Sequence, residues 1–105
     1  MERAYFVYLL RCADNSLYTG ITTDVGRRFE EHRSKPVGAK YTAARTPVRM
    51  ERVWSCDGRS AASKLEARIK QLSHAQKERL VADGSRLSAL LGQIIDTTLY
   101  REESV

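Results

Sequence analysis

The sequence has little cysteine, and the two cysteines it has are not placed to bind metal or to form a disulfide framework. They are Cys12 and Cys56, in a chain of 105 residues. A small disulfide-stabilised domain needs a denser set, and a structural zinc site needs ligands paired at short spacing. We therefore expect two reduced thiols, as is usual in the cytoplasm.

Long hydrophobic runs are also missing. No stretch approaches the roughly 20 consecutive apolar residues that a membrane-spanning helix requires. The first residues lead directly into a β-rich segment, without the three regions of a secretion signal. Because repeats, low-complexity tracts and linker-like stretches are absent too, we expect a single domain with no membrane partner.

Acidic residues are fewer than basic ones. The chain has 13 Asp and Glu against 18 Lys and Arg, which gives a net charge of +5. Such a balance favours nucleic acid as a partner, because Lys and Arg release counterions from the phosphate backbone. Part of the excess lies in one run that contains Arg27, Arg28, His32, Arg33, Lys35, Lys40, Arg45 and Arg49. A merely solvated basic face is the alternative for this run.

A β-hairpin is predicted near the start of the chain. Residues 5–10, with the sequence YFVYLL, are apolar β-formers and predict a strand buried on both faces. Turn-formers at 14–16 and a resumed extended pattern at 17–19 predict a second strand that folds back on the first. Gly20 is expected to end this second strand, because glycine permits a sharp turn or a close backbone approach.

A helix is predicted directly after the hairpin. Thr23 and Asp24 are both good N-cap residues. Val25, Arg28 and His32 then follow at three- and four-residue spacing, which is typical of one face of a helix. The hairpin tyrosines could therefore converge with this arginine and histidine on one small surface.

The second half predicts one further strand and then helices. Residues 48–54 contain β-formers and are followed by an Asp-Gly turn, which favours a third strand. Ser60 is expected to cap a helix whose apolar stripe runs as far as Leu72. Ser73 has the spacing of a capping box and predicts that a new helix begins there.

These elements together predict an α/β domain with a small three-stranded antiparallel sheet flanked by helices. The domain proper is expected to cover residues 1–84. Residues 85–105 are expected to belong to the same domain, as a short helix capped by Ser85 and a frayed tail from Arg101. This leucine- and isoleucine-rich segment could pack on the domain, or could bind a second copy or a partner protein.

Two short motifs in the predicted hairpin carry a family resemblance. Phe6-Val7-Tyr8 precedes Tyr18-Thr19-Gly20 by ten residues, and Arg28 follows on the predicted helix. This order resembles the GIY-YIG nuclease superfamily, and above all its small stand-alone bacterial, YhbQ-type branch. Glu66, within the sequence LEARIK, stands where the family carries a metal-binding glutamate. The resemblance covers nearly the whole predicted domain.

The resemblance implies a metal-dependent endonuclease that hydrolyses phosphodiester bonds in DNA and leaves 5′-phosphate and 3′-hydroxyl ends. Glu66 would hold one divalent ion, Mg²⁺ or Mn²⁺, which often takes only one or two protein carboxylates. Arg28 would bind the phosphate, and Tyr18 would activate the water, with Tyr8 orienting it or exchanging roles. His32 would hydrogen-bond a tyrosine or relay a proton. Arg28 and the metal are expected to lower the tyrosine pKa from its ordinary value near 10.

A long loop is expected to add contacts with the substrate. Residues 34–47 show no clear period, and a loop of this length is usually functional or mobile. Lys40 and Arg45 would contact the nucleic-acid backbone, Tyr41 offers a stacking surface, and Gly20 would allow a close approach. A solvated loop without a partner is the alternative.

Each catalytic candidate also has an ordinary structural interpretation. Tyr8 and Tyr18 would be core aromatics with a hydroxyl at the surface. Arg28 would be a charge on a helix surface, and Glu66 would pair with Lys70 one turn along its helix. At the level of function, the alternatives are a non-catalytic nucleic-acid-binding module and a protein-interaction subunit that uses the C-terminal segment.

Overall fold

An antiparallel sheet forms the centre of the protein in a computed structural model, which describes residues 3–34 and 46–105. Within these residues the sheet has four strands in the order β2-β1-β3-β4. The strands are β1 (Ala4–Cys12), β2 (Leu17–Thr22), β3 (Pro47–Asp57) and β4 (Arg101–Glu103). The helices are α1 (Val25–Ser34), α2 (Arg59–Lys70), α3 (His74–Ala82) and α4 (Leu87–Leu91), with 3₁₀ turns η2 (Gly84–Arg86) and η3 (Thr97–Leu99). The predicted α/β class is confirmed, but the predicted number of strands is one too low.

The additional strand, β4, lies where a frayed tail was expected. It pairs with β3, with Glu102 opposite Trp54. Arg52 of β3 forms an ion pair with Glu102, and its Nε donates to the carbonyl oxygen of Val81 at 3.0 Å. Gly84 lies so close to Glu102 that a Cβ at this glycine would overlap the carboxylate. The tail is therefore held by pairing to the sheet, by the ion pair with Arg52 and by its contact with Gly84 of η2.

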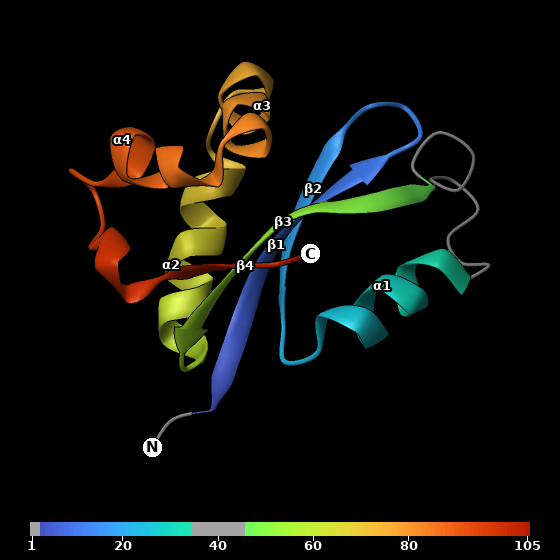
Figure 1. Ribbon diagram of the computed structural model, residues 1–105, viewed down its shortest axis with the longest axis horizontal. Helices are drawn as coiled ribbons and strands as arrows, with labels where there is room; N and C mark the ends of the chain where they lie inside the picture. Colours follow the sequence, from blue (N-terminus) through green and yellow to red (C-terminus); the bar gives the residue numbers. More distant parts are fainter. Residues whose placement is uncertain (1–2, 35–45) are drawn as a thin grey trace.

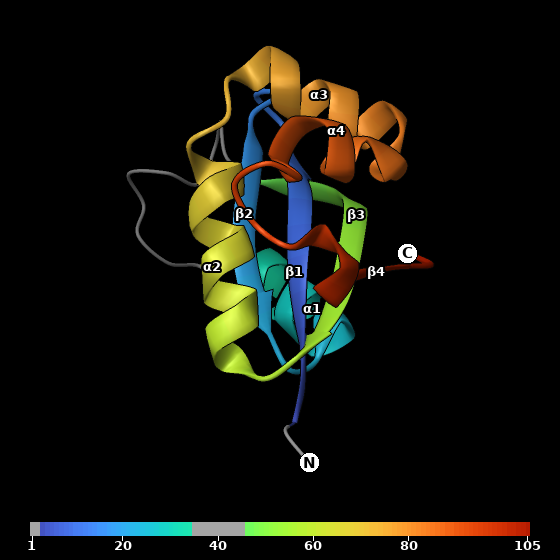
Figure 2. The same cartoon turned by 90° about the vertical axis from the view of Figure 1, so that its left-hand side faces the viewer.

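Helices cover both faces of the sheet (Figures 1 and 2). α1 lies on one face, and α2, α3 and α4 lie on the other. Successive side chains of a strand point to opposite faces, so the central strand β1 contributes to both layers. Val7 and Leu9 face α2, whereas Tyr8 and Leu10 face α1, and all four are at most 1% exposed. The prediction of a strand buried on both faces is confirmed.

The two layers have separate hydrophobic cores of unequal size. The buried residues of the larger core, on the α2 side, are Val7, Leu9, Leu17, Trp54, Cys56, Ala62, Leu65, Ile69, Leu80, Leu87, Leu91 and Tyr100. The smaller core, on the α1 side, has buried Tyr8, Leu10 and Val53, with Phe6, Val25, Phe29 and Met50 packed against it. Residues from the C-terminal segment therefore share the larger core with the hairpin.

Buried thiols and short helices agree with the composition of the chain. Cys12 and Cys56 are both free and both buried. No helix in the described part of the chain combines the length and the apolar character needed to cross a membrane.

Several element ends lie where local sequence signals predicted them. Asn15 has a left-handed φ of 69° in the hairpin turn, a conformation that asparagine tolerates well. The carboxylate of Asp24 accepts a hydrogen bond from the backbone N–H of Arg27 at 3.0 Å and so caps α1. Ser73 and Gln76 form the complete capping box at the start of α3.

Three predicted ends are wrong. Gly20 lies inside β2 rather than at its end. Ser60 lies within α2, whose N-cap is Gly58 in a left-handed conformation with φ of 86°. The cap before the last helical segment is Asp83, whose carboxylate accepts from the backbone N–H of Ser85 at 3.0 Å. The strand β2 therefore continues two residues beyond Gly20, to Thr22, and the two helical caps lie two residues before the predicted ones, at Gly58 and Asp83.

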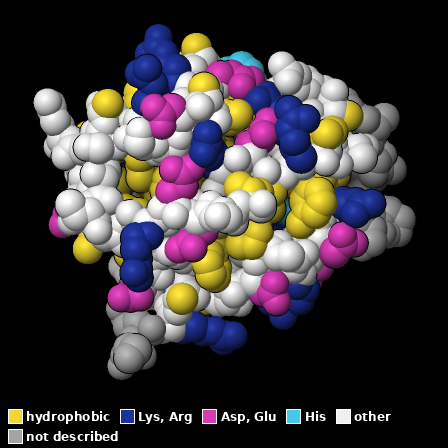
Figure 3. All heavy atoms as spheres, viewed as in Figure 1, with side chains coloured by type: hydrophobic (Ala, Val, Ile, Leu, Met, Phe, Trp, Pro, Cys, Tyr) yellow, Lys and Arg dark blue, Asp and Glu magenta, His cyan; other side chains and the backbone are white. Residues whose placement is uncertain are grey.

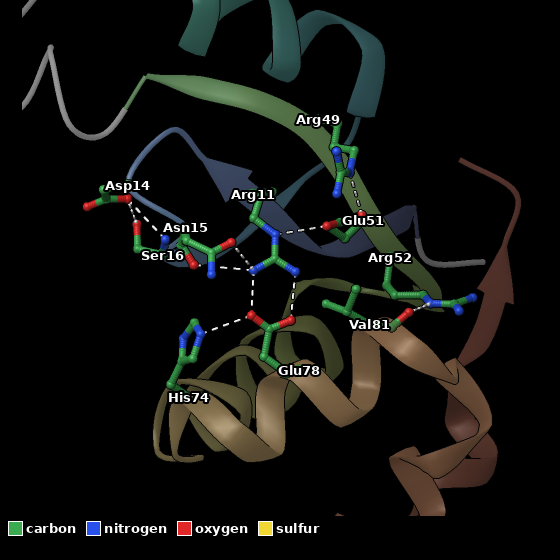
Figure 4. Close-up of polar contacts among 10 residues, drawn as sticks. All are labelled: Arg11, Asp14, Asn15, Ser16, Arg49, Glu51, Arg52, His74, Glu78 and Val81. Atoms are coloured by element: carbon green, nitrogen blue, oxygen red, sulfur yellow. Dashed lines mark hydrogen bonds and ion pairs between the residues drawn. The ribbon is translucent and has the colours of Figure 1, made fainter.

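A buried arginine joins the hairpin, β3 and α3 (Figure 4). Arg11 is 8% exposed, and its Nε donates to Glu51 Oε2 at 2.9 Å. Its two terminal nitrogens donate to the two oxygens of Glu78, at 2.5 and 2.7 Å, and one of them also bonds Asn15. Arg49 donates to the other oxygen of Glu51 at 3.0 Å. This pairing offsets the cost of burying the guanidinium, and Arg11 holds the pKa of Glu78 below its usual value.

Candidate active site

Tyr8 occupies the centre of the candidate site. It lies on the central strand β1 with 0% exposure, and its hydroxyl is 3.0 Å from Nε2 of His32 on α1. Its partner on β2 is Gly20, where an added Cβ would be 2.7 Å from the Tyr8 Cζ atom. Gly20 is therefore needed to leave space for the Tyr8 ring, which explains a glycine in the interior of a strand.

Three aromatic rings cluster on the α1 face. The Tyr18 ring centroid is 6.1 Å from that of Tyr8 and 5.3 Å from that of His32. The Tyr18 and His32 rings meet edge to face, at 68°. Tyr18 is 42% exposed, whereas Tyr8 is fully buried. The site thus offers one phenol that is open to solvent and one that is held in the protein.

Arg28 brings a permanent positive charge to these rings. It lies on α1 one turn before His32, and its Nη1 donates to Glu31 Oε1 at 3.2 Å. Its Nε is buried and has no hydrogen-bond partner among the described residues. Interaction with the Tyr8 hydroxyl is the main cause that raises the Arg28 pKa. The guanidinium therefore has one buried donor without an acceptor among the described residues.

The pKa of Tyr8 is raised above its ordinary value. Burial is the largest cause, because a phenolate loses its hydration in the protein interior. The Arg28 guanidinium opposes this effect, while the charges of Tyr18 and Glu66 add to it. Tyr8 therefore keeps its proton at neutral pH and acts as a hydrogen-bonding group in this structure.

Glu66 approaches from the opposite layer. Its helix, α2, contacts β1 and the edge strand β2 on the face away from α1. The carboxylate nonetheless acts on the Tyr8 phenol, whose pKa it raises. It forms an ion pair with Lys70, whose Nζ is 3.4 Å from Oε2, so the ordinary pairing predicted for Glu66 is present. The Glu66 side chain is 23% exposed and remains accessible.

The donor set at Glu66 fits a hydrated divalent ion. No group of three or more His, Cys, Asp and Glu within residues 3–34 and 46–105 could hold a metal. This excludes a closed zinc-type site from the described region. Mg²⁺ keeps several waters and is commonly bound by one or two carboxylates plus substrate phosphates. One accessible glutamate, Glu66, is compatible with that mode of binding.

The expected basic surface is only partly visible. Lys40, Tyr41 and Arg45 lie outside the described residues, so their substrate contacts stay predictions. The described arginines of the basic run pair with glutamates: Arg27 and Arg28 with Glu31, Arg33 with Glu30, and Arg49 with Glu51. Acidic and basic side chains are intermingled over the face seen in Figure 3. Sequence reasoning missed Glu31, although its three-residue spacing from Arg28 could have indicated it.

Comparison with known families gives the site its context. Residues 4–79 match the family model described as the GIY-YIG catalytic domain. The chain belongs to the GIY-YIG family. This nuclease domain contains all five catalytic and metal-binding candidates: Tyr8, Tyr18, Arg28, His32 and Glu66.

Several proteins with the UPF0213 name are similar to this chain over most of its length. A UPF0213 protein of Vibrio cholerae is 56% identical over 89 residues, which are 82% of this chain and 85% of that protein. UPF0213 protein YhbQ of Escherichia fergusonii is 46% identical over 90 residues, covering 86% and 89% of the two chains. A solution NMR structure of a UPF0213 protein from Bacillus halodurans is 44% identical, covers 75% of this chain and 83% of that one, and has a TM-score of 0.49. The resemblance to the YhbQ-type branch is confirmed.

Proposed function

We propose that this GIY-YIG domain is a metal-dependent endonuclease that hydrolyses phosphodiester bonds in DNA and leaves 5′-phosphate and 3′-hydroxyl ends. The observation that carries the proposal is the position of the Tyr8 hydroxyl, 3.0 Å from His32 and next to the Arg28 guanidinium. Tyr18 is close to the same point. Two phenols, an imidazole and a guanidinium are groups that a phosphodiester hydrolase can use together.

Arg28 would neutralise the charge that develops on the phosphate. Its buried Nε lacks a described partner, and its bond from Nη1 goes to Glu31, which is 44% exposed. An exposed ion pair of this kind is weak. Breaking the ion pair with Glu31 would therefore cost little free energy. A phosphate oxygen that replaces Glu31 would form a charge-assisted hydrogen bond with the guanidinium.

The two tyrosines would have different roles. Tyr18 is the exposed phenol, so we assign to its phenolate form the role of general base: Oη takes one proton from the attacking water and becomes a phenol again. Tyr8 is buried with a raised pKa and would keep its proton, orienting the water or a phosphate oxygen by a hydrogen bond. His32 would fix the Tyr8 hydroxyl through its Nε2.

The metal enters this proposal through Glu66 alone. A divalent ion held there, Mg²⁺ or Mn²⁺, would supply positive charge for a phosphate oxygen and the leaving 3′ oxygen. The proposed substrate is nucleic acid, and we propose DNA rather than RNA. The two free, buried thiols agree with a cytoplasmic location, which is part of the same proposal.

A cleavage screen tests the proposed function. Single-stranded, duplex and branched DNA would be incubated with Mg²⁺ or Mn²⁺, and ligation of the products would report the end chemistry. Glu66→Gln should abolish cleavage and retain binding of DNA. The matched control is Glu30→Gln, which changes an exposed glutamate of α1 that pairs with Arg33. Cleavage that persists in Glu66→Gln would contradict the metal-binding role.

The same screen distinguishes the main alternative. A non-catalytic nucleic-acid-binding module would bind these DNAs and leave them intact with either ion. The pairing of Glu66 with Lys70 is the observation that favours this alternative, because the carboxylate already has a counter-ion within the protein.

A further inference from the structure

A hollow of about 440 Å³ adjoins the candidate site, and the roles assigned above leave it unused. Leu10, Leu17 and Pro47 contribute its apolar lining. Tyr18 and His32 form the part of its wall that is shared with the candidate site, and Ser16 lines it as well. Its volume falls in the range of roughly 300 to 1,000 Å³ that is usual for small-ligand sites.

The described part of the lining is unsuited to a phosphate and suited to a flat, uncharged ring. None of the described residues that line the hollow is a Lys, Arg, Asp or Glu. Tyr18 is one of the few large hydrophobic residues of the described chain that are exposed, at 42%, and it lies on this wall. Nucleic-acid bases stack on such aromatic side chains whatever their sequence, because every base has a π-face.

The position of the hollow connects it to the reacting phosphate. Tyr18 and His32 belong both to its wall and to the ring cluster around Tyr8. Arg28, which would bind the phosphate, lies on the same helix as His32 and is close enough to the Tyr8 hydroxyl to act on its pKa. If a phosphate is bound at Arg28, the hollow lies within reach of groups only a few bonds away from that phosphate. The base of the same or the adjoining nucleotide is such a group.

We propose that this hollow is a base-binding subsite, in which a base next to the scissile phosphate leaves the stack and lies against Tyr18. This inference rests on the proposed nuclease function and specifies its substrate class. The preferred substrate is nucleic acid in which that nucleotide is unpaired: a single strand, a bulge, a flap or a mismatch. A paired base must first be unstacked and unpaired, which costs free energy that an unpaired base does not require.

The subsite accepts different bases with little discrimination. Base identity is read by hydrogen bonds to the base edge, and the described part of the lining supplies few groups for this purpose. The Ser16 hydroxyl already bonds Asp14 Oδ1 at 2.5 Å, and His32 Nε2 is engaged by Tyr8. The selection is therefore for unpaired structure rather than for sequence.

The test measures binding rather than cleavage. The Glu66→Gln variant is mixed with oligonucleotides that carry the fluorescent base 2-aminopurine in a matched duplex, in a bulge and in a single strand. We expect at least tenfold tighter binding of the bulge and the single strand, and a position-dependent change of fluorescence. Equal affinity for matched and unpaired forms, with no fluorescence change, overturns the subsite while DNA binding and the proposed function stand. Failure to bind any of the three overturns both.

Variants at the wall separate the ring of Tyr18 from its hydroxyl. Tyr18→Phe keeps the ring and should retain the preference for unpaired bases, whereas Tyr18→Leu should lose it. Ser16→Phe, which fills the hollow, should also lose the preference, and Ala13→Phe places the same bulk in the exposed turn as a control. Thermal unfolding of each variant checks that it is folded. A preference that survives both Tyr18→Leu and Ser16→Phe overturns the proposal.

Discussion

At the scale of single residues, Gly20 and Tyr8 depend on each other across two neighbouring strands. The Tyr8 ring occupies the space where a side chain at Gly20 would lie. We expect Gly20→Ala to cost about 1–3 kcal/mol of the free energy of unfolding, as overpacking of a core usually does. Displacement of the ring should also separate the Tyr8 hydroxyl from His32 and lower the cleavage rate. Thermal unfolding and cleavage kinetics measure the two effects.

Gly26→Ala is the matched control for this substitution. Gly26 lies in α1, and the nearest atom to an added Cβ is Asp24 Oδ1 at 3.8 Å. Alanine in a helix is more favourable than glycine by up to roughly 1 kcal/mol. This variant should therefore be as stable as the parent or more stable. Unchanged stability and cleavage in Gly20→Ala would show that the Tyr8 ring can adopt another conformation that avoids the added methyl group.

The raised pKa of Tyr8 makes a second prediction at this scale. The phenol has a higher pKa in the folded chain than its ordinary value of 10.0, so its protonated form stabilises the fold. This contribution is complete below about pH 10 and is lost as the pH rises through the pKa of the folded state. An absorbance titration of tyrosinate should show a late-titrating phenol that is missing in Tyr8→Phe. Loss of an early-titrating phenol in that variant would contradict burial as the dominant cause.

At the scale of elements, α2 carries the proposed metal ligand together with its competitor. The Lys70 ammonium lies 3.4 Å from Glu66, so a divalent ion must displace it or share the carboxylate with it. We expect Lys70→Met to strengthen Mn²⁺ binding by the free protein about two- to fivefold, in keeping with the strength of an exposed ion pair. Calorimetry without nucleic acid measures this affinity.

Lys64→Met removes the same charge from an exposed position of the same helix and serves as the control. It should change Mn²⁺ affinity less, because Lys64 forms no described ion pair with Glu66. An equal effect of the two substitutions would mean that only the overall charge matters. No effect of either would mean that Glu66 does not bind the ion in the free protein.

The elements that the sequence predicted well are those with strong local signals. The apolar run of β1 and the capping box at Ser73 each act within a few residues, and both are present in the structure. The strand β4 is three exposed residues, Arg-Glu-Glu, and has no hydrophobic pattern to mark it. Its pairing depends on partners from β3 and α3 that are distant in the sequence. Local reasoning could not have found it.

The candidate site was predictable in its members and less so in its geometry. The order and spacing of the two tyrosine motifs indicated Tyr8, Tyr18 and Arg28. Burial of Tyr8 is a tertiary property, and its effect on the pKa of the phenol outweighs that of the Arg28 charge. The position of Glu66 in the layer opposite α1 also depends on how α2 packs against β1 and β2. The spacing of residues in the sequence does not reveal this packing.

At the scale of the whole molecule, buried ion pairs make the free energy of unfolding depend on pH in the acidic range, where their carboxylates become protonated. Arg11 holds the pKa of Glu78 below its ordinary value of 4.5. Burial raises the pKa of Glu51, but Arg49 and Arg11 together lower it further than burial raises it. Carboxylates of this kind stabilise the fold above about pH 4.5, and the contribution is lost as the pH falls through their folded-state pKa values.

We therefore expect the melting temperature to fall steeply below pH 4.5. Glu78→Gln should lower the melting temperature at neutral pH and flatten its dependence on acid. Glu30→Gln, at an exposed glutamate outside the Arg11 network, should keep the dependence of the parent. Calorimetric melting between pH 7 and 3 measures the slopes. Equal slopes in parent and Glu78→Gln would assign acid lability to other groups.

The unequal cores have a consequence for how the protein loses activity on warming. The α1 layer rests on three buried residues and the opposite layer on twelve, within the described chain. Local opening is easiest where the fewest apolar contacts must be broken. Amide hydrogens of α1 should then exchange with solvent sooner than those of α2, and inactivation should precede melting. The proposed nuclease site would come apart when one helix detaches, while the sheet beneath it is still intact.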